Sequence, residues 1–403
     1  MKLLTLKVVS LTLLLIFLTA CGNTRQPAPS DGEVDIASGQ QAQSGSKRAW
    51  SGGFKAWNGG FKAWNGGTSS VDSSGAVLVE NAAIWNKLRL IVAHQELAKK
   101  LGKDVVVAVI DTGVDHRHPI FVNRLTPRNT WYDFVSRDTN PQEVNGAAYG
   151  HGTVVASIVL QVAPNAKIMP LRVLNGNGSG NVAHVAAAID WAANRGAKVI
   201  QLSLGTEAAS PEIEAAVDRA ARRGIYVVAS AGNSNANPTY PAYTAMLEEP
   251  APTPTSNMAV GVGSVTINDV KSSFSNFVPE EGPIEDGLEM VSFGEDVYGA
   301  VPGSRIAAWD GTSMAAPMVA GALALAIAEG VEAISPGTLA LEVVESSLDI
   351  EADTVVNGVA VEFEQRLDIA EFLCSALNLS DAQCEQAVID ANDDDDDDDE
   401  EED

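Results

Sequence analysis

The stretch Val105-Val106-Val107-Ala108-Val109-Ile110, followed by Asp111, decides the fold of this chain. Consecutive apolar residues, most of them β-branched, are typical of a parallel strand that is buried on both faces of a sheet. Because such a strand needs helices on both sides, the stretch predicts an α/β fold with a doubly wound sheet. It also places a carboxylate where the strand ends.

Helical and strand-like segments alternate after this strand. Apolar residues recur at helical spacing over 181–195 and 211–223, and strand-like runs follow at 198–204 and 225–231. This alternation implies right-handed crossovers and a mostly parallel sheet flanked by helices. In sheets of this kind the active site lies beyond the carboxyl ends of the strands.

Chemically active side chains occur where strands end or helices begin. Asp111 ends the buried strand, His151 lies between two glycines at the start of an apolar helix, and Ser313 begins a second apolar helix. A serine hydroxyl becomes a nucleophile when a histidine accepts its proton, and a carboxylate orients that histidine. Asn233 follows another strand and could donate its amide hydrogen to a developing oxyanion. Together these residues supply every group that acyl transfer requires.

Three motifs carry a family resemblance. Asp-Thr-Gly-Val-Asp at 111–115, His-Gly-Thr at 151–153 and Gly-Thr-Ser-Met-Ala-Ala-Pro at 311–317 resemble, in this order, the subtilisin-like serine proteases (subtilases). The resemblance spans residues 84–330 and implies a serine endopeptidase that requires no cofactor. It also implies that an extended peptide binds by β-augmentation between two cleft walls. The implied substrate-binding residues are Gly178, Ser179, Gly180, Ser203, Leu204, Gly205, Ala231 and Gly232.

The chain departs from the family pattern at positions that do not carry catalysis. Val154, Ser157 and Met318 replace a customary histidine, glycine and histidine, and we expect altered packing. Many subtilases carry a calcium-binding loop after the helix of the histidine, but here the chain runs from Ser157 straight to Pro164. Calcium binding elsewhere stays open, and no metal site is predicted. The Pro- and Glu-rich segment 244–256 looks like an insertion near the specificity pocket.

The first twenty residues predict a signal peptide. Two lysines precede an apolar run from Val8 to Leu18, which is short for a membrane-spanning helix. Leu-Thr-Ala-Cys at 18–21 resembles the bacterial lipobox, which implies that Cys21 is lipidated and anchors the protein to a bacterial membrane or cell envelope. A plain cleavable signal peptide is the alternative, and the protein would then be released. Both interpretations predict an extracytoplasmic protein.

Residues 21–82 predict a flexible tether, because Gly, Ser, Gln and Asn dominate the segment. The sequence Gly-Gly-Phe-Lys-Ala-Trp-Asn occurs in it twice, at 52–58 and 59–65. These aromatic residues could dock on a partner, on the protein itself or on a membrane interface, or the repeat could be a duplicated linker without a role.

The rest of the chain divides into three parts by our prediction. The peptidase domain occupies 83–333, a helical appendage 334–392, and a disordered tail 393–403, whose residues are all acidic. Cys374 and Cys384 could form a disulfide in an oxidising compartment or remain separate thiols. The tail is typical of a solvating segment, although weak calcium binding stays open.

Net charge and the number of motif copies argue against several other function classes. The net charge of −27 argues against binding nucleic acid through charge. Asp-Thr-Gly alone would suit an aspartic protease, but that chemistry needs two such carboxylates and no second copy occurs. His116 and His118 beside Asp115 invite a metal site, yet the resemblance places them in a structural loop. We expect a monomer that acts on protein or peptide substrates. A non-catalytic surface binder and acyl transfer to an amine stay open.

Overall fold

The computed structural model describes residues 37–38, 77–206, 210–235, 259–277, 290–331, 348–349, 354–356, 359–361 and 365–397. All of them belong to one compact unit, Glu33–Asp403. The signal peptide, Cys21, the aromatic repeats and the segment 244–256 lie outside the described residues.

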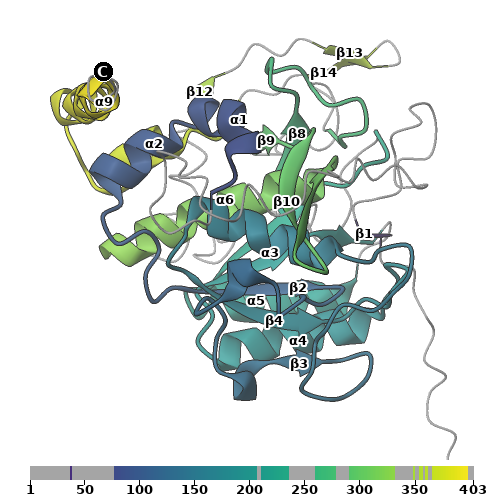
Figure 1. Ribbon diagram of the computed structural model, residues 1–403. Helices are drawn as coiled ribbons and strands as arrows, with labels where there is room; N and C mark the ends of the chain where they lie inside the picture. Colours follow the sequence, from purple (N-terminus) through teal and green to yellow (C-terminus); the bar gives the residue numbers. More distant parts are fainter. Residues whose placement is uncertain are drawn as a thin grey trace, which may run out of the picture. The chain divides into compact units, whose positions relative to one another are not determined.

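A nine-stranded sheet forms the centre of this unit, in the order β12-β15-β9-β8-β7-β5-β2-β4-β3 (Figure 1). Every neighbouring pair is parallel except β12 and β15. The doubly wound, mostly parallel sheet predicted from the sequence is therefore confirmed. The strands are β2 (Val106–Asp111), β3 (Tyr132–Asp133), β4 (Lys167–Arg172), β5 (Val199–Leu202), β7 (Tyr226–Ser230), β8 (Ala259–Val265), β9 (Met290–Phe293), β12 (Leu348–Asp349) and β15 (Gln365–Arg366).

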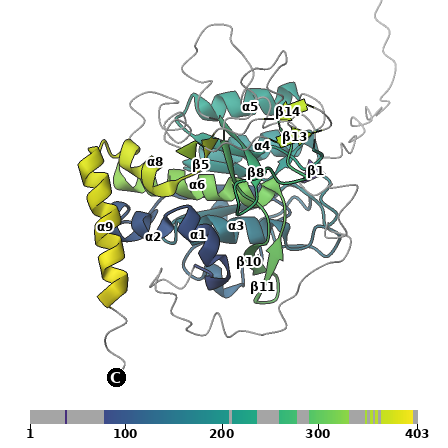
Figure 2. The same cartoon turned by 90° about the horizontal axis from the view of Figure 1, so that it is seen from above.

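Helices cover both faces of the sheet. One face packs against α3 (His151–Val162) and α6 (Thr312–Glu329), and the other against α4 (Val182–Asn194) and α5 (Pro211–Ala221). Figure 2 shows α3 and α6 side by side above the sheet.

Successive residues of β2 serve different cores. Val107 and Val109 belong to the apolar cluster of α3 and α6, whereas Ala108 and Ile110 belong to the cluster of α4 and α5. This alternation follows from the two-residue period of a strand, and it explains why the whole run is apolar. Asp111 continues the odd-numbered series, so its side chain is directed toward the face that α3 and α6 cover.

The helix α6 is buried on all sides. Among the described residues it alone is long and apolar enough to cross a membrane, but 89% of the stretch lies inside the protein. A helix that is apolar all round suits such a position in a core. A Cβ atom at Gly321 would lie 2.5 Å from the Cβ atom of Val162, so glycine is required where α6 crosses α3.

Short strands and helical turns complete the unit. Two hairpin-like pairs are antiparallel: β10 with β11, and β13 with β14. A further antiparallel pair joins β1 to β6, far apart in the sequence. These elements are β1 (Ala37–Ser38), β6 (Leu204–Gly205), β10 (Val297–Val301), β11 (Arg305–Trp309), β13 (Thr354–Val356), β14 (Val359–Val361), α1 (Ala82–Lys87), α2 (Leu90–Val92), the π-helical turn η2 (Ala93–Leu97) and the 3₁₀ turns Val79–Asn81, Pro119–Phe121 and Arg128–Thr130.

A buried amide cluster joins the N-terminal segment to α3. The Oε1 atom of Gln161 accepts hydrogen bonds from the Leu78 amide (3.2 Å) and from Asn81 Nδ2 (2.9 Å). Both side chains also bond to the backbone of Tyr298. These contacts occupy the amide oxygens near the end of α3, and β4 begins soon afterwards at Lys167.

The C-terminal region differs from the helical appendage that we expected at 334–392. Two of its strands, β12 and β15, extend the central sheet, and β15 pairs with β9 through Arg366 and Val291. In the described part of this region the helices are α8 (Ile369–Ala376) and α9 (Asp381–Asp397). The backbone of α9 is helical to Asp397, so the tail that we expected to be disordered from 393 begins as helix.

Ion pairs fasten this region to the first helices of the unit. Arg89 Nε lies 2.7 Å from Asp368 Oδ2, and Arg89 Nη2 lies 2.9 Å from Glu371 Oε2. Asp368 also caps α8, because its Oδ1 accepts a hydrogen bond from the Glu371 amide at 3.0 Å. Arg366 Nη1 donates to the carbonyl oxygen of Lys87 at 3.1 Å. A disulfide between Cys374 and Cys384 joins α8 to α9.

Replacing Asp368 tests this connection. We expect Asp368→Ala to lower the free energy of unfolding by about 2 kcal/mol, because a buried ion-pair partner and a helix cap are lost together. The change is measured as a shift of the denaturant midpoint. Glu371→Gln is the control, since that side chain is 53% exposed and its ion pair should contribute less than about 1 kcal/mol. Equal effects of the two substitutions would contradict the assignment.

Candidate active site

The carboxylate of Asp111, the last residue of β2, meets the imidazole of His151, the first residue of α3. Asp111 Oδ1 lies 2.7 Å from His151 Nδ1 and also accepts a hydrogen bond from the Thr112 amide at 2.6 Å. His151 is fully buried and Asp111 is almost so. The contact fixes Nδ1 as the protonated nitrogen, which leaves Nε2 to act as a base.

The close approach of α3 to β2 requires glycine next to the histidine. A Cβ atom at Gly152 would lie 2.2 Å from the carbonyl oxygen of Gly113 and 3.0 Å from the Cβ atom of Asp111. On its other side the imidazole packs edge-on against Trp309, with ring centroids 6.2 Å apart. The ring is therefore held by a carboxylate, a tight backbone contact and an indole.

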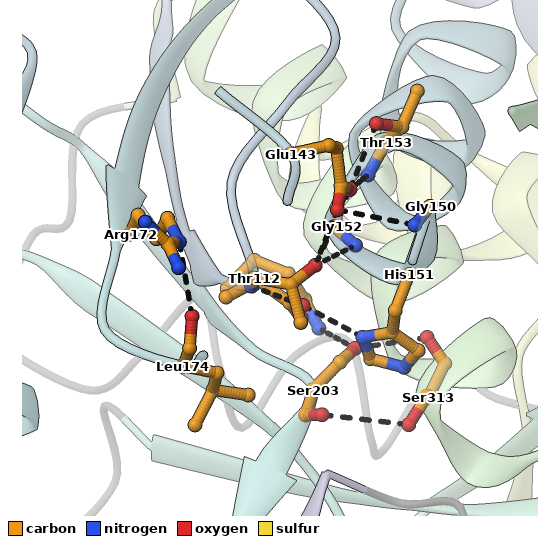
Figure 3. A network of polar contacts seen from close by, with 12 residues as sticks. Thr112, Glu143, Gly150, His151, Gly152, Thr153, Arg172, Leu174, Ser203 and Ser313 are labelled. Carbon is orange, nitrogen blue, oxygen red and sulfur yellow. Dashed lines mark hydrogen bonds and ion pairs between the residues drawn. The ribbon is translucent and has the colours of Figure 1, made fainter. Parts of the chain in front are cut away.

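Ser313 is the second residue of α6, and it lies beside His151 in Figure 3. Its Oγ donates a long hydrogen bond of 3.5 Å to the carbonyl oxygen of Ser203, while Ser203 Oγ donates to the carbonyl oxygen of Ser313 at 2.8 Å. Among the described residues, His151 Nε2 has no hydrogen-bond partner. Rotation of the Ser313 side chain about its Cα–Cβ bond would redirect the hydroxyl toward that nitrogen.

Asn233 reaches the same helix terminus from β7. Its Oδ1 accepts hydrogen bonds from the amide and from the hydroxyl of Thr312, both at 2.9 Å. Because both contacts use the side-chain oxygen, the Nδ2 group remains available as a donor next to Ser313. The N-terminus of α6 adds positive potential at this point through the helix dipole.

The predicted cleft walls follow two other strands. Residues 174–180 fold back on themselves, with an antiparallel bridge between Leu174 and Gly180 and a turn at Gly178. The second wall, Leu204–Gly205, forms β6 and pairs with Ala37–Ser38. The first segment contains Gly178, Ser179 and Gly180. The second contains Leu204 and Gly205, and Ser203 directly precedes it.

Ala231 and Gly232 have a different environment from the two walls. The Ala231 amide donates to the Val262 carbonyl oxygen, and the Gly232 amide donates to Thr312 Oγ1 at 3.1 Å. Their carbonyl oxygens accept hydrogen bonds from Asn276. Their backbone groups are thus hydrogen-bonded within the protein, and their role in substrate binding stays a prediction.

Comparison with known proteins agrees with this geometry. Residues 102–365 match the profile of the Subtilase family. The chain belongs to this family. The resemblance drawn from the three motifs is confirmed, and the matched segment extends past residue 333, where we expected the peptidase domain to end.

The matches to individual relatives cover different shares of those relatives' own length. Thermitase of Thermoactinomyces vulgaris is 39% identical over 240 residues, which are 57% of this chain and 77% of thermitase. Thermophilic serine proteinase of Bacillus sp. (strain AK1) is 37% identical over 234 residues, but the match spans 52% of that protein. The crystal structure of a cold adapted subtilisin-like serine proteinase superimposes with a TM-score of 0.54 at 31% identity, covering 66% of this chain and 89% of that one.

Sequence patterns did not reveal Glu143, a buried carboxylate that contacts the chain neighbours of Asp111 and His151. It accepts hydrogen bonds from Thr112, Gly150 and Thr153. Burial raises the pKa of Glu143 from 4.5 to about 7, although the bonds from Gly150 and Thr153 lower it, and the charge of Asp111 raises it further. An acidic residue shortly before a Gly-His-Gly helix start was the signal that could have revealed it.

No group of three or more His, Cys, Asp or Glu side chains in the described part of the chain could hold a metal ion. His116 and His118 are not gathered with other ligands. His118 Nδ1 accepts the Ile120 amide at 3.3 Å, and its Nε2 contacts the Arg305 carbonyl oxygen at 3.0 Å. The structural role expected for this loop agrees with these contacts.

We expect Asn233→Ala to lower kcat by about 10²–10³-fold, the loss that removal of such a donor causes in subtilisin. KM for a peptide should change little, because Asn233 would contact the oxyanion and not the bound strand. Steady-state kinetics on a chromogenic peptide provide both constants. Asn235→Ala, two residues further along, serves as the control. A large rise of KM with unchanged kcat would contradict the oxyanion role.

Proposed function

We propose that this subtilase is a serine endopeptidase that hydrolyses proteins or peptides through an acyl-enzyme. The observation that supports this most directly is the contact of Asp111 with His151, which lies beside Ser313 at the start of α6 (Figure 3). The Asn233 side chain bonds to Thr312, the residue before Ser313. In this reaction Ser313 Oγ attacks the peptide carbonyl carbon and transfers its proton to His151 Nε2.

Collapse of the tetrahedral intermediate completes acylation. The imidazolium at His151 gives its proton to the leaving amine, and Asp111 stabilises the positive charge through the Nδ1 hydrogen bond. Asn233 Nδ2 and the amides at the start of α6 would stabilise the negative oxygen. Water then attacks the ester by the same route, which releases the second product and regenerates Ser313.

An extended substrate would bind as an added strand. The pairing of Ala37 with Gly205 and of Ser38 with Leu204 supports this mode, because it places an extended segment antiparallel to the second wall. Main-chain hydrogen bonds then supply affinity, and side-chain pockets supply selectivity. The same wall is joined to the nucleophile through Ser203, whose hydroxyl bonds to the Ser313 carbonyl oxygen.

Substitution of the nucleophile tests the activity. Ser313→Ala should lower hydrolysis of casein by on the order of 10⁶-fold in kcat, the loss that the corresponding change causes in subtilisin. Labelling by a fluorophosphonate should disappear with it. Ser380→Ala, at an exposed serine between α8 and α9, is the control and should keep both properties.

Unchanged hydrolysis by Ser313→Ala would exclude the proposed nucleophile. A wild-type protein that captures a partner yet forms no acyl-enzyme would instead indicate a surface binder. Mass spectrometry of the products separates hydrolysis from transfer of the acyl group to an amine.

We also propose that the protein acts outside the cytoplasm and is anchored through lipid on Cys21. The support is the Leu-Thr-Ala-Cys sequence that follows the short apolar run. Cys21→Ser should move the protein from the membrane fraction to the soluble fraction, since acyl chains would supply its membrane affinity. An inhibitor of the lipoprotein signal peptidase should leave a longer precursor. Membrane retention of a processed Cys21→Ser protein would place the anchor elsewhere.

A further inference from the structure

The carboxylate of Glu143 lies at a junction of the fold, between the end of β2 and the first turn of α3 (Figure 3). Its Oε1 accepts hydrogen bonds from the amide and the hydroxyl of Thr153, at 3.0 and 2.9 Å. Its Oε2 accepts from the Gly150 amide at 3.1 Å. The hydroxyl of Thr112 reaches both oxygens, at 3.2 and 3.1 Å.

Both threonine hydroxyls are committed to this carboxylate as donors. Thr112 Oγ1 accepts a hydrogen bond from the Gly152 amide at 2.9 Å, and Thr153 Oγ1 accepts one from the Asp115 amide at 2.9 Å. A hydroxyl has a single hydrogen, and each of these directs it to Glu143. The surroundings of the carboxylate are therefore donors, which is the arrangement that suits an anion.

The donors are the chain neighbours of the two residues that must meet. Thr112 follows Asp111 directly, and Gly150 precedes His151. Amide groups in the first turn of a helix have no partner within the helix, so they need an external acceptor when they are buried, and the helix dipole favours an anionic one. One buried side chain thus fixes the base and the carboxylate relative to each other without contacting either.

We propose that Glu143 is a positioning residue of this peptidase, whose anionic carboxylate holds the end of β2 against the first turn of α3 and so aligns Asp111 with His151. Its kinetic consequences rest on the proposed function, whereas its effect on the His151 environment does not.

Stability alone does not account for an anion at this place. Burial raises the pKa of Glu143 to about 7, so the carboxyl group is protonated in the folded protein at pH values where it is ionised in the unfolded chain. Its contribution to stability is present below the unfolded value near 4.5 and is lost as the pH rises through about 7. Ionised Glu143 therefore lowers the stability of the folded protein at pH values above about 7, which is the range in which the surrounding donors meet a carboxylate.

Several titratable groups face this carboxyl group from the surrounding elements. The charge of Asp111 on β2 acts on Glu143 directly, and the phenol of Tyr149 senses both Glu143 and Asp115. His151 on α3 bonds to the same Asp111. As the pH falls through about 7, uptake of a proton by Glu143 removes an acceptor and a negative charge from this group of residues.

The test compares Glu143→Gln and Glu143→Asp with the wild type. Glutamine keeps the shape but presents an amide group to donors, so we expect kcat per fluorophosphonate-titrated active site to fall by about 10²-fold through misalignment. KM should stay within about two-fold, because neither cleft wall contacts Glu143. Aspartate keeps the charge and should recover part of the loss. Glu212→Gln, at an exposed position at the start of α5, is the matched control and should behave as wild type.

The Nδ1–H signal of His151 separates alignment from folding. In the wild type this proton lies in the 2.7 Å hydrogen bond to Asp111, and its NMR signal reports that contact. In Glu143→Gln we expect the signal to shift or broaden, whereas Glu143→Asp should keep it closer to the wild type. A merely structural role would lower the melting temperature and the fraction of titratable sites, but would leave kcat per site and the Nδ1–H signal unchanged, and that result would overturn the proposal.

Two further measurements cover failure of the first variant or of the enzyme activity. If Glu143→Gln does not fold, Thr112→Val removes a donor to Glu143 and Thr112→Ser retains it, so only the valine variant should lose kcat. Equal activity of the two variants would count against the proposal. If the wild type hydrolyses nothing, the proposed function fails, but the His151 Nδ1–H signal of the variants still decides whether Glu143 aligns Asp111 with His151.

Discussion

The close packing of α3 against α6 is the contact on which the site depends. Both helices lie on the same face of the sheet, and glycine at 321 lets them approach until a side chain would collide with Val162. Because both begin at the carboxyl edge, their first residues meet there. His151 and Ser313 therefore take their positions from core packing and not from loops. The two-residue period of β2 then directs Asp111 toward the same point.

Local patterns made these parts predictable from sequence. The apolar run before Asp111, the glycines around His151 and the apolar helix after Ser313 each record their surroundings within a few neighbouring residues. The central strand, the two helix starts and Asn233 could be found for this reason. The family resemblance predicts the cleft walls, and the structure adds that the backbone groups of Ala231 and Gly232 bond internally.

Other parts depend on contacts that a linear pattern does not record. The environment of Glu143 is formed by hydrogen-bond donors at residues 112, 150 and 153, which come together only when β2 and α3 pack. Strands of two or three residues carry too little periodicity to be recognised, so β12 to β15 were expected to be helical. The partners of Arg89 lie almost three hundred positions along the chain, and nothing near them in sequence indicates the pairing.

The ion pair of Arg89 with Asp368 and the hydrogen bond of Arg366 to the Lys87 carbonyl oxygen have a consequence for the order in which the molecule folds. A chain emerging from the ribosome or an export channel carries its first helices long before β15 and α8 exist. The last strand that completes the parallel part of the sheet is also the last one made. The fold can therefore be completed only when nearly the whole chain is present. The active site then forms at the end of synthesis and transport.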